Sequence, residues 1–258
     1  MSTWKSYIIL HKKRHRREIG LMLVEGARLC REAITSAMEC EEIFVTESFQ
    51  ESDEWKTIET LAWKRQIECR VIDEKSLKRL AETESPQGII LIAHIPKNDL
   101  STLSVAPDSI FLVLDSVRDP GNVGTLIRTA DWFNAAGVLL ADSVDPWSGK
   151  VLRSSMGSAF RLPVIETDIA EALTWLSQNK IDCIASTLEA KENLDTAKFN
   201  KPTALLLGSE AHGLSAATVD KANRTMKIAG FGGAESLNVA VAGGIFLEKI
   251  ARTLGKDS

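Results

Sequence analysis

The sequence has few of the residues that mark specialised classes of protein. Its four cysteines, Cys30, Cys40, Cys69 and Cys183, form no CxxC pair, which argues against a zinc site and against a disulfide framework. Sixteen glycines and seven prolines in 258 residues are too few for a collagenous or low-complexity chain. The sequence therefore predicts a globular protein that holds no metal ion and keeps its thiols reduced in the cytoplasm.

Long hydrophobic runs are also missing. The longest apolar stretch, residues 239–247, is far short of the roughly 20 residues that a membrane-spanning helix needs. The N-terminus is polar and basic, unlike the apolar core of an export signal. We expect neither export nor a membrane span, and a cytoplasmic location.

Basic residues gather at the N-terminus, although the net charge of the chain is −4. Within the run HKKRHRR the cationic side chains are Lys12, Lys13, Arg14, Arg16 and Arg17. Such a cluster attracts and holds the phosphates of a nucleic acid. A solvated basic helix explains the pattern equally well, so the five residues are candidate RNA contacts with that alternative left open.

Residues 1–100 show one alternation of apolar strands and amphipathic helices. The pattern predicts strands at 22–24, 42–46, 69–72 and 88–94, and helices at 26–38, 53–66 and 74–80. Periodicity is then lost in a polar stretch that contains Pro96 and Pro107. We therefore predict two domains, 1–100 and 101–258.

The second domain repeats the alternation on a larger scale. Strands are expected at 110–114, 137–141, 162–165, 182–186, 203–207 and 225–228, and helices at 122–133, 148–157, 168–178 and 237–254. Apolar strands separated by helices indicate an α/β fold with a parallel sheet covered on both faces. Ligands bind such sheets beyond the carboxyl ends of the strands, which draws attention to the loops after Leu114, Leu207 and Ile228.

The first of these loops reads DSVRDPGNVGTLIRTAD from Asp115 to Asp131. Pro120 suits the first turn of a helix, and free N–H groups there would attract a phosphate. Arg128 is predicted to point away from the apolar face of this helix. A surface arginine paired with Asp131 is the simpler explanation, and the absence of a GK[ST] triplet excludes a Walker loop.

The second loop, LLLGSEAHGLS at residues 205–215, follows a buried strand. Glu210 and His212 suggest acid/base chemistry, but on spacing alone a solvated or helix-capping glutamate and an incidental loop histidine are the preferred explanation. The third loop begins at Ile228 and holds a glycine cluster, GFGG. Ser236 or Glu235 is expected to cap the helix that follows, with Asn238 in its first turn.

Taken in order, the three loops resemble the three motifs of the SpoU (TrmH) family of RNA ribose 2′-O-methyltransferases, within the SPOUT superfamily. The first motif has the form NxGxxxR, the second is a strand ending in LGSExxGL, and the third contains SLNV. The matching residues are Asn122, Gly124 and Arg128; Leu207, Gly208, Ser209, Glu210, Gly213 and Leu214; and Ser236, Leu237, Asn238 and Val239.

This resemblance implies an α/β methyltransferase domain with a trefoil knot, a homodimer whose active site uses both subunits, and S-adenosylmethionine as the cofactor. Residues 23–34, LVEGARLCREAI, are similar to a small RNA-binding domain of ribosomal-protein type that many members carry. One departure is that members have a proline-containing IPM-like turn where this chain has Ile228, Ala229, Gly230 and Phe231. A more mobile turn would weaken cofactor binding.

The resemblance also implies roles for individual residues. Arg128 would stabilise the developing charge on the ribose oxygen and hold a phosphate. It would not act as a base, because a guanidinium stays protonated in proteins and cannot accept a proton. Catalytic positions are Arg128, Asn122, Glu210, Ser236 and Asn238. Cofactor-binding positions are Leu207, Gly208, Ser209, Glu210, Gly213, Ile228, Leu237, Asn238 and Val239.

The function implied is methylation of a ribose 2′-hydroxyl, with ribosomal RNA as the expected substrate because a separate substrate domain precedes the motifs. Two alternatives stay open. The same chemistry on transfer RNA is one, and an inactive RNA-binding protein that assists ribosome assembly is the other. The intact SLNV motif, Arg128 and Asn122 favour the enzyme.

Overall fold

The computed structural model describes residues 4–255, which fold into two compact units. The first unit consists of the chain up to Lys97 together with Trp147–Arg161, and the second of Asn98–Pro146 together with the chain from Leu162 onward. The chain thus passes between the units three times. Among the described residues, no helix is long and apolar enough to cross a membrane.

The first unit contains a four-stranded sheet in the order β1 (Leu21–Glu25), β4 (Ile89–His94), β2 (Cys40–Val45), β3 (Glu68–Val71). Only β2 and β3 are parallel, and β4 runs antiparallel to both of its neighbours. The predicted strands are present, but the sheet is mixed because the last strand enters between β1 and β2. An alternation of strands and helices does not reveal this insertion.

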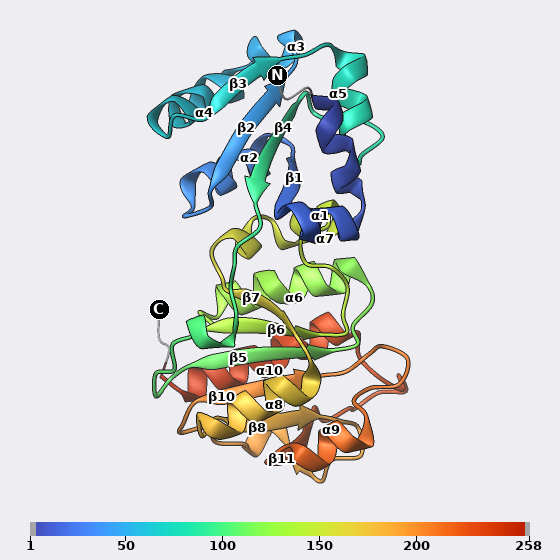
Figure 1. Ribbon diagram of the computed structural model, residues 1–258. Coiled ribbons are helices and arrows are strands. Elements are labelled where there is room, and N and C mark those ends of the chain that lie inside the picture. The colour runs from blue at the N-terminus through green and yellow to red at the C-terminus, as the bar shows by residue number, and fades with distance from the viewer. Residues whose placement is uncertain (1–3, 256–258) are drawn as a thin grey trace. The chain divides into compact units, whose positions relative to one another are not determined.

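Helices cover both faces of this sheet (Figure 1). Leu23, Phe44 and Ile92 belong to a buried cluster that η1 (Trp4–His11) and α5 (Glu74–Leu80) complete. The alternate residues point to the other face, where α2 (Ala27–Thr35) packs on β1 and β4 and against α4 (Asp53–Lys64). The remaining helices of the unit are α1 (Lys13–Ile19), α3 (Glu47–Gln50), α7 (Gly149–Ser155) and η3 (Ser158–Phe160).

The second unit is built on a seven-stranded sheet in the order β7-β6-β5-β10-β8-β11-β9. Every pairing in it is parallel, which confirms the predicted sheet. The strands are β5 (Ile110–Asp115), β6 (Gly137–Ala141), β7 (Val164–Thr167), β8 (Asp182–Ser186), β9 (Glu192–Asn193), β10 (Thr203–Leu207) and β11 (Arg224–Lys227).

One face of the second sheet is covered by α8 (Ile169–Gln178), whose Leu173 and Leu176 join a core with Phe111, Val113 and Leu206. The other face carries α6 (Pro120–Trp132) and α10 (Val239–Thr253), which pack against each other. Shorter elements are η2 (Leu100–Thr102), η4 (Leu194–Thr196) and α9 (Ala216–Lys221).

The contact between α6 and α10 depends on a glycine. A Cβ atom at Gly243 would lie 2.4 Å from Leu126 Cδ2 and 2.9 Å from Leu207 Cδ1, closer than side chains tolerate. Gly243 therefore lets α10 sit directly on α6 and on the end of β10. This close packing sets the start of α10 beside the loops that follow β5 and β10.

Candidate active site

Three polar loops meet at the carboxyl edge of the second sheet. They follow β5, β10 and β11, which end at Asp115, Leu207 and Lys227. These are the loops singled out in the sequence, and parallel strands bring their carboxyl ends to one edge. Their side chains are in direct contact.

Asn122 joins the three loops. Its Nδ2 donates to Glu210 Oε1 at 2.8 Å, and its Oδ1 accepts from Asn238 Nδ2 at 3.0 Å. One residue of each motif thus takes part in a single hydrogen-bonded chain, although the three positions are 88 and 116 residues apart along the sequence. The structure therefore brings together Asn122, Glu210 and Asn238 as the sequence predicted.

The first turn of α6 is already capped by a carboxylate. Asp119 is the N-cap, and its Oδ1 accepts from the backbone N–H of Asn122 at 2.8 Å. A negative charge at a helix N-terminus satisfies the N–H groups and opposes a second anion there. The cap occupies one of the N–H groups that could hold a phosphate, and the phosphate cradle stays a prediction. Asp119 fixes the backbone from which the Asn122 side chain projects.

The start of α10 is capped by Asn238 rather than by Ser236 or Glu235. Asn238 Oδ1 accepts from the N–H groups of Ala240 at 2.8 Å and Val241 at 3.3 Å. The cap consumes the amide oxygen and leaves Nδ2 to donate to Asn122. Asn238 therefore has a fixed orientation, which an N-cap at either of the earlier positions would not provide.

A tight turn follows β10. Ser209 and Gly213 exchange two backbone hydrogen bonds, of 3.2 and 2.9 Å, and Gly213 has a left-handed φ of +66°. A Cβ atom at Gly208 would lie 2.1 Å from the carbonyl carbon of Gly213. The turn closes only because residue 208 is glycine.

Asp115 supports this turn and was not predicted from the sequence. Its Oδ2 accepts from Thr218 Oγ1 at 3.1 Å, and Thr218 follows Ser215, the N-cap of α9. The contact ties the end of β5 to the segment after the Gly213 turn. An aspartate that directly follows a buried apolar strand was the available signal.

Arg128 lies on α6 with its side chain exposed, as predicted. Among the described residues it forms no hydrogen bond or ion pair, so the predicted alternative of a pair with Asp131 is not formed. It lies six residues beyond Asn122, which is about 9 Å along a helix axis. Within one chain Arg128 therefore stands outside the hydrogen-bonded chain, and its catalytic role stays a prediction.

The loop between β11 and α10 is open. Phe231 is 95% exposed, and a Cβ atom added at Gly230, Gly232 or Gly233 would have no neighbour within 4 Å. This is the turn that lacks the family's proline. Ser236 and Leu237 are exposed, Ile228 and Val239 are half-buried, and none of these four side chains is hydrogen-bonded to Asn122 or Glu210.

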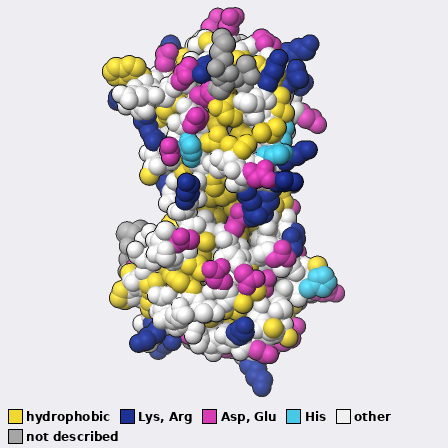
Figure 2. Space-filling model, viewed as in Figure 1, with side chains coloured by type: hydrophobic (Ala, Val, Ile, Leu, Met, Phe, Trp, Pro, Cys, Tyr) yellow, Lys and Arg dark blue, Asp and Glu magenta, His cyan; other side chains and the backbone are white. Residues whose placement is uncertain are grey.

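The basic N-terminal run falls on α1 and the residue before it. Lys12, Arg14 and Arg17 are exposed and Lys13 is half-buried. Arg14 Nε donates to Glu18 at 2.7 Å, and this hydrogen bond lowers the pKa of Glu18. On the face shown in Figure 2, Lys and Arg side chains alternate with Asp and Glu rather than forming one continuous basic surface.

Arg16 is the exception in this run. It is 4% exposed, its Nη1 donates to the carbonyl oxygen of Leu10 at 2.6 Å, and it lies 3.7 Å from Glu82. A guanidinium held inside the unit does not contact RNA. The prediction that Arg16 binds RNA is therefore wrong, because its helix turns this one residue of the run toward the core.

Sequence comparisons find similarity to one group of proteins, the rRNA methyltransferases. Residues 109–248 match the model of the SpoU rRNA Methylase family, and residues 3–91 match that of an MRM3-like substrate binding domain. The chain is 32% identical over 245 residues to the 23S rRNA (guanosine(2553)-2′-O)-methyltransferase RlmP of Bacillus subtilis, covering 95% of this chain and 92% of that protein. It is 31% identical over 194 residues to the 23S rRNA (guanosine-2′-O-)-methyltransferase RlmB of Haemophilus influenzae, covering 72% and 79%.

Solved structures agree with the sequences. An AdoMet-bound rRNA methyltransferase from Sinorhizobium meliloti superposes with a TM-score of 0.86 at 27% identity, covering 96% of this chain and 94% of that one. The SpoU methyltransferase AviRb from Streptomyces viridochromogenes, in complex with AdoMet, gives a TM-score of 0.87 at 25% identity, covering 98% and 97%. Both similarities span the two units.

Proposed function

Because the chain belongs to the SpoU rRNA methylase family, we propose that it transfers the methyl group of S-adenosylmethionine to a ribose 2′-hydroxyl of ribosomal RNA. The observation that carries this proposal is the hydrogen-bonded chain from Glu210 through Asn122 to Asn238. It joins one residue of each of the three family motifs at one edge of the sheet. An inactive descendant would have no need to keep this arrangement.

The residues at the site fit the cofactor. The loop after β11 is exposed from Gly230 to Asn238, and a Cβ atom at Gly230, Gly232 or Gly233 would have no neighbour within 4 Å, so a ligand can approach its main chain closely. Backbone groups of Gly208, Ile228 and Leu237 would hold the adenosyl group, with Ser209, Gly213 and Val239 shaping the pocket beside Leu207. When bound, S-adenosylmethionine supplies an activated methyl group, and the protein needs no metal ion for the transfer.

The protein's own contribution is electrostatic. A ribose hydroxyl is a poor nucleophile until charge on its oxygen is stabilised. Arg128 donates from a planar, permanently charged fork that suits both an oxyanion and a phosphate. Asn122, Glu210 and Asn238 fix the loops around the reacting sugar, and Ser236 adds a hydroxyl beside Asn238. These assignments rest on the motifs and on the contacts among Asn122, Glu210 and Asn238.

The proposed function is tested by methyl transfer from radiolabelled S-adenosylmethionine to total RNA, followed by separation of the RNA by size. We expect label in large ribosomal RNA, on ribose. Label in transfer RNA would show that the substrate is transfer RNA and that the reaction is the proposed one. Saturable cofactor binding in calorimetry without any transfer, to free RNA or to ribosomal particles, would instead favour an RNA-binding assembly factor.

We further propose that the protein acts as a homodimer, with α6 and α10 at the interface. Val241 and Ile245 lie one turn apart on α10 and are 51% and 40% exposed, and Trp132 on α6 is 83% exposed. Large apolar side chains grouped on two packed helices are typical of an interaction surface. The trefoil knot that the family implies would lie beside this surface, in the chain after β10.

Replacing Ile245 by Glu is expected to convert the dimer to a monomer. A carboxylate in the centre of an apolar interface would lose its hydration, which is costly without a partner. Light scattering coupled to gel filtration should show half the wild-type mass. Val71→Glu is the matched control, because Val71 is 49% exposed but lies on β3 of the first unit. A monomeric wild-type protein at micromolar concentration would overturn the dimer.

The first unit is proposed to bind the RNA substrate. Its match to a substrate binding domain and the exposed side chains of Lys12, Arg14 and Arg17 support this assignment. Lys13, which is half-buried, remains a candidate. An enzyme that modifies ribosomal RNA works where ribosomes are made, so we propose that the chain acts in the cytoplasm.

A further inference from the structure

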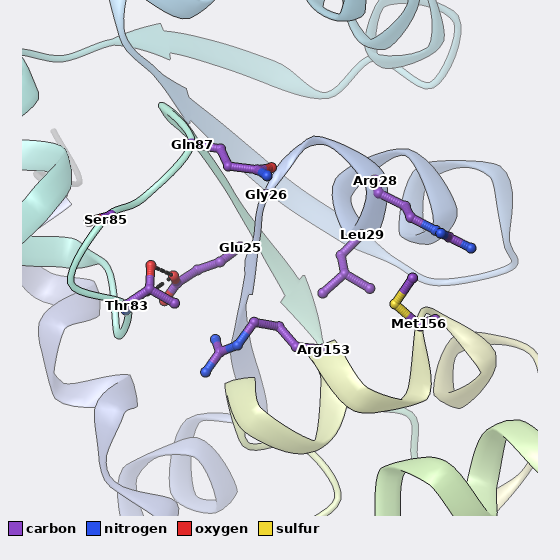
Figure 3. Close-up of a pocket in the computed structure, with 9 residues that line it drawn as sticks. All are labelled: Glu25, Gly26, Arg28, Leu29, Thr83, Ser85, Gln87, Arg153 and Met156. Carbon is purple, nitrogen blue, oxygen red and sulfur yellow. Dashed lines mark hydrogen bonds between the residues drawn. The ribbon is translucent and has the colours of Figure 1, made fainter. Parts of the chain in front are cut away.

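The first unit contains a cavity at the start of α2 (Figure 3). Its volume is about 340 Å³, and β1, α2, the segment 83–87 and α7 supply its lining. Two apolar side chains, Leu29 and Met156, face it together with two cationic ones, Arg28 and Arg153. A cavity of this composition accepts a ligand with a flat apolar body and several hydrogen-bond acceptors.

Arg153, which lines the cavity, lacks a hydrogen-bond partner for one of its donors within the part of the chain that the structure describes. Its Nη1 atom is buried and has no hydrogen-bond partner among the described residues. Buried guanidinium groups are normally hydrogen-bonded, because an unmatched donor costs the full price of its lost hydration. Arg153 lines one end of the cavity, and its guanidinium forms no hydrogen bond among the described residues.

The acidic groups nearby are already engaged. Glu25 accepts from the backbone N–H of Glu82, and from the N–H and the hydroxyl of Thr83 at 3.3 and 2.8 Å. Glu82 accepts from the N–H of Gly149 at 3.1 Å and lies 3.7 Å from Arg16. Among the described residues Arg153 forms no ion pair within 4 Å, although its charge acts at longer range on Glu82, against the burial that raises the pKa of that carboxyl group.

The other end of the cavity carries Arg28. Its side chain is exposed and makes no hydrogen bond or ion pair among the described residues. Figure 3 shows the two guanidinium groups at opposite ends of the lining, with Leu29 between them and Met156 near Arg28. Gln87 accepts from the backbone N–H of Ala27 at 3.1 Å and so holds the rim of the cavity in place.

We propose that this cavity receives one nucleotide of the RNA substrate. The base lies against Leu29 and Met156 and accepts hydrogen bonds from Arg153, while Arg28 contacts the adjoining phosphate. Proteins read single-stranded RNA by taking unstacked bases into such pockets. Arginine pairs best with the two neighbouring acceptors of guanine, O6 and N7, which makes guanine the favoured base. The inference rests on the proposed function, since an RNA substrate supplies the nucleotide.

The test uses the full chain and a fluorescent single-stranded oligoribonucleotide that contains guanine, with binding followed by anisotropy. Arg153→Met keeps the length of the side chain and removes its charge and donors. It should weaken binding about tenfold and should raise the melting temperature, because an unpaired buried donor is lost. Arg28→Met should weaken binding and reduce the salt dependence by about one counterion.

A chemical variant of the RNA isolates the base contact. Replacing guanine by 7-deazaguanine removes the N7 acceptor, so binding to the wild-type protein should weaken while binding to Arg153→Met should not change further. Arg31→Met is the matched control, because Arg31 is an exposed arginine one turn further along α2 that does not line the cavity. It should retain wild-type affinity and the full effect of 7-deazaguanine.

Wild-type RNA affinity in both Arg28→Met and Arg153→Met would overturn the proposal, as would displacement of the RNA by inorganic phosphate alone. If Arg153→Met does not fold, Arg28→Met and the 7-deazaguanine probe still decide the matter. If the cavity does not bind RNA, cofactor binding and methyl transfer by the wild-type protein are still expected. Failure of the proposed function would abolish those two activities instead.

Discussion

Replacing Arg128 by Ala is expected to lower kcat for methyl transfer by about 10²- to 10³-fold, while calorimetry still shows S-adenosylmethionine bound with near wild-type affinity. The separation of the two effects follows from the position of Arg128. It lies outside the contacts that join Asn122, Glu210 and Asn238, with its side chain exposed and without a hydrogen bond or ion pair to any residue that the structure describes. Its loss should therefore remove transition-state stabilisation without disturbing the loops that shape the cofactor pocket.

Arg128→Lys tests the kind of interaction. Lysine keeps the positive charge but loses the planar fork that donates to two oxygens at once. A partial recovery of kcat, well below the wild-type value, is expected. Single-turnover transfer from labelled cofactor measures the chemical step in each variant. Wild-type rates in Arg128→Ala would remove this residue from the mechanism.

A mixing experiment shows whether Arg128 serves its own protomer or the partner. Arg128→Ala and Gly208→Ala proteins are each expected to be inactive. If the active site combines Arg128 from one protomer with the Gly208 turn of the other, refolding the two variants together restores one working site per mixed dimer, roughly a quarter of wild-type activity. No recovery would place the whole site within one protomer.

Gly208→Ala is expected to abolish measurable cofactor binding and to lower the free energy of unfolding by about 1–3 kcal/mol. The added methyl group would lie 2.1 to 2.3 Å from backbone atoms of Gly213 and Leu214, so the turn must open. Opening breaks the hydrogen bonds between Ser209 and Gly213 and moves the main-chain groups proposed to hold the adenosyl moiety. Thermal unfolding and calorimetry measure the two effects.

Gly255→Asn is the matched control outside the site. Gly255 has a restricted backbone, with φ at +76°, but no atom lies within 4 Å of its Cβ position. Asparagine adopts the left-handed region more readily than other residues, so this variant should bind the cofactor nearly as well as wild type. Equal cofactor affinity in Gly208→Ala and wild type would show that the turn does not form the pocket.

The sequence predicted the second unit well because its signals are local. Apolar strands such as 203–207 are short, bounded and separated by helices, and parallel sheets follow from that pattern. The motif loops then meet because parallel strands end at the same edge. The mixed sheet of the first unit was harder, since the place of β4 between β1 and β2 depends on contacts distant in sequence.

The hydrogen-bond partners and burial of individual side chains were the least predictable part of the site. Asp119 and Asn238 both act as helix caps, and a cap one or two residues away would have satisfied the sequence pattern equally well. Arg16 sits in a run of basic residues, yet its position on α1 turns it inward. The sequence pattern gives Arg153 no role, because Leu29 and Gln87, which line the cavity with it, are distant in the chain.

The allocation of residues 147–161 to the first unit has a consequence for synthesis and engineering. During translation the first unit stays incomplete until residue 161 has emerged, by which time the β5 and β6 strands of the second have already been made. The first unit is therefore completed only after synthesis of the second has begun. A hybrid enzyme spliced once at Lys97 would carry α7 from the wrong parent, so exchanging RNA specificity between relatives requires two separate grafts.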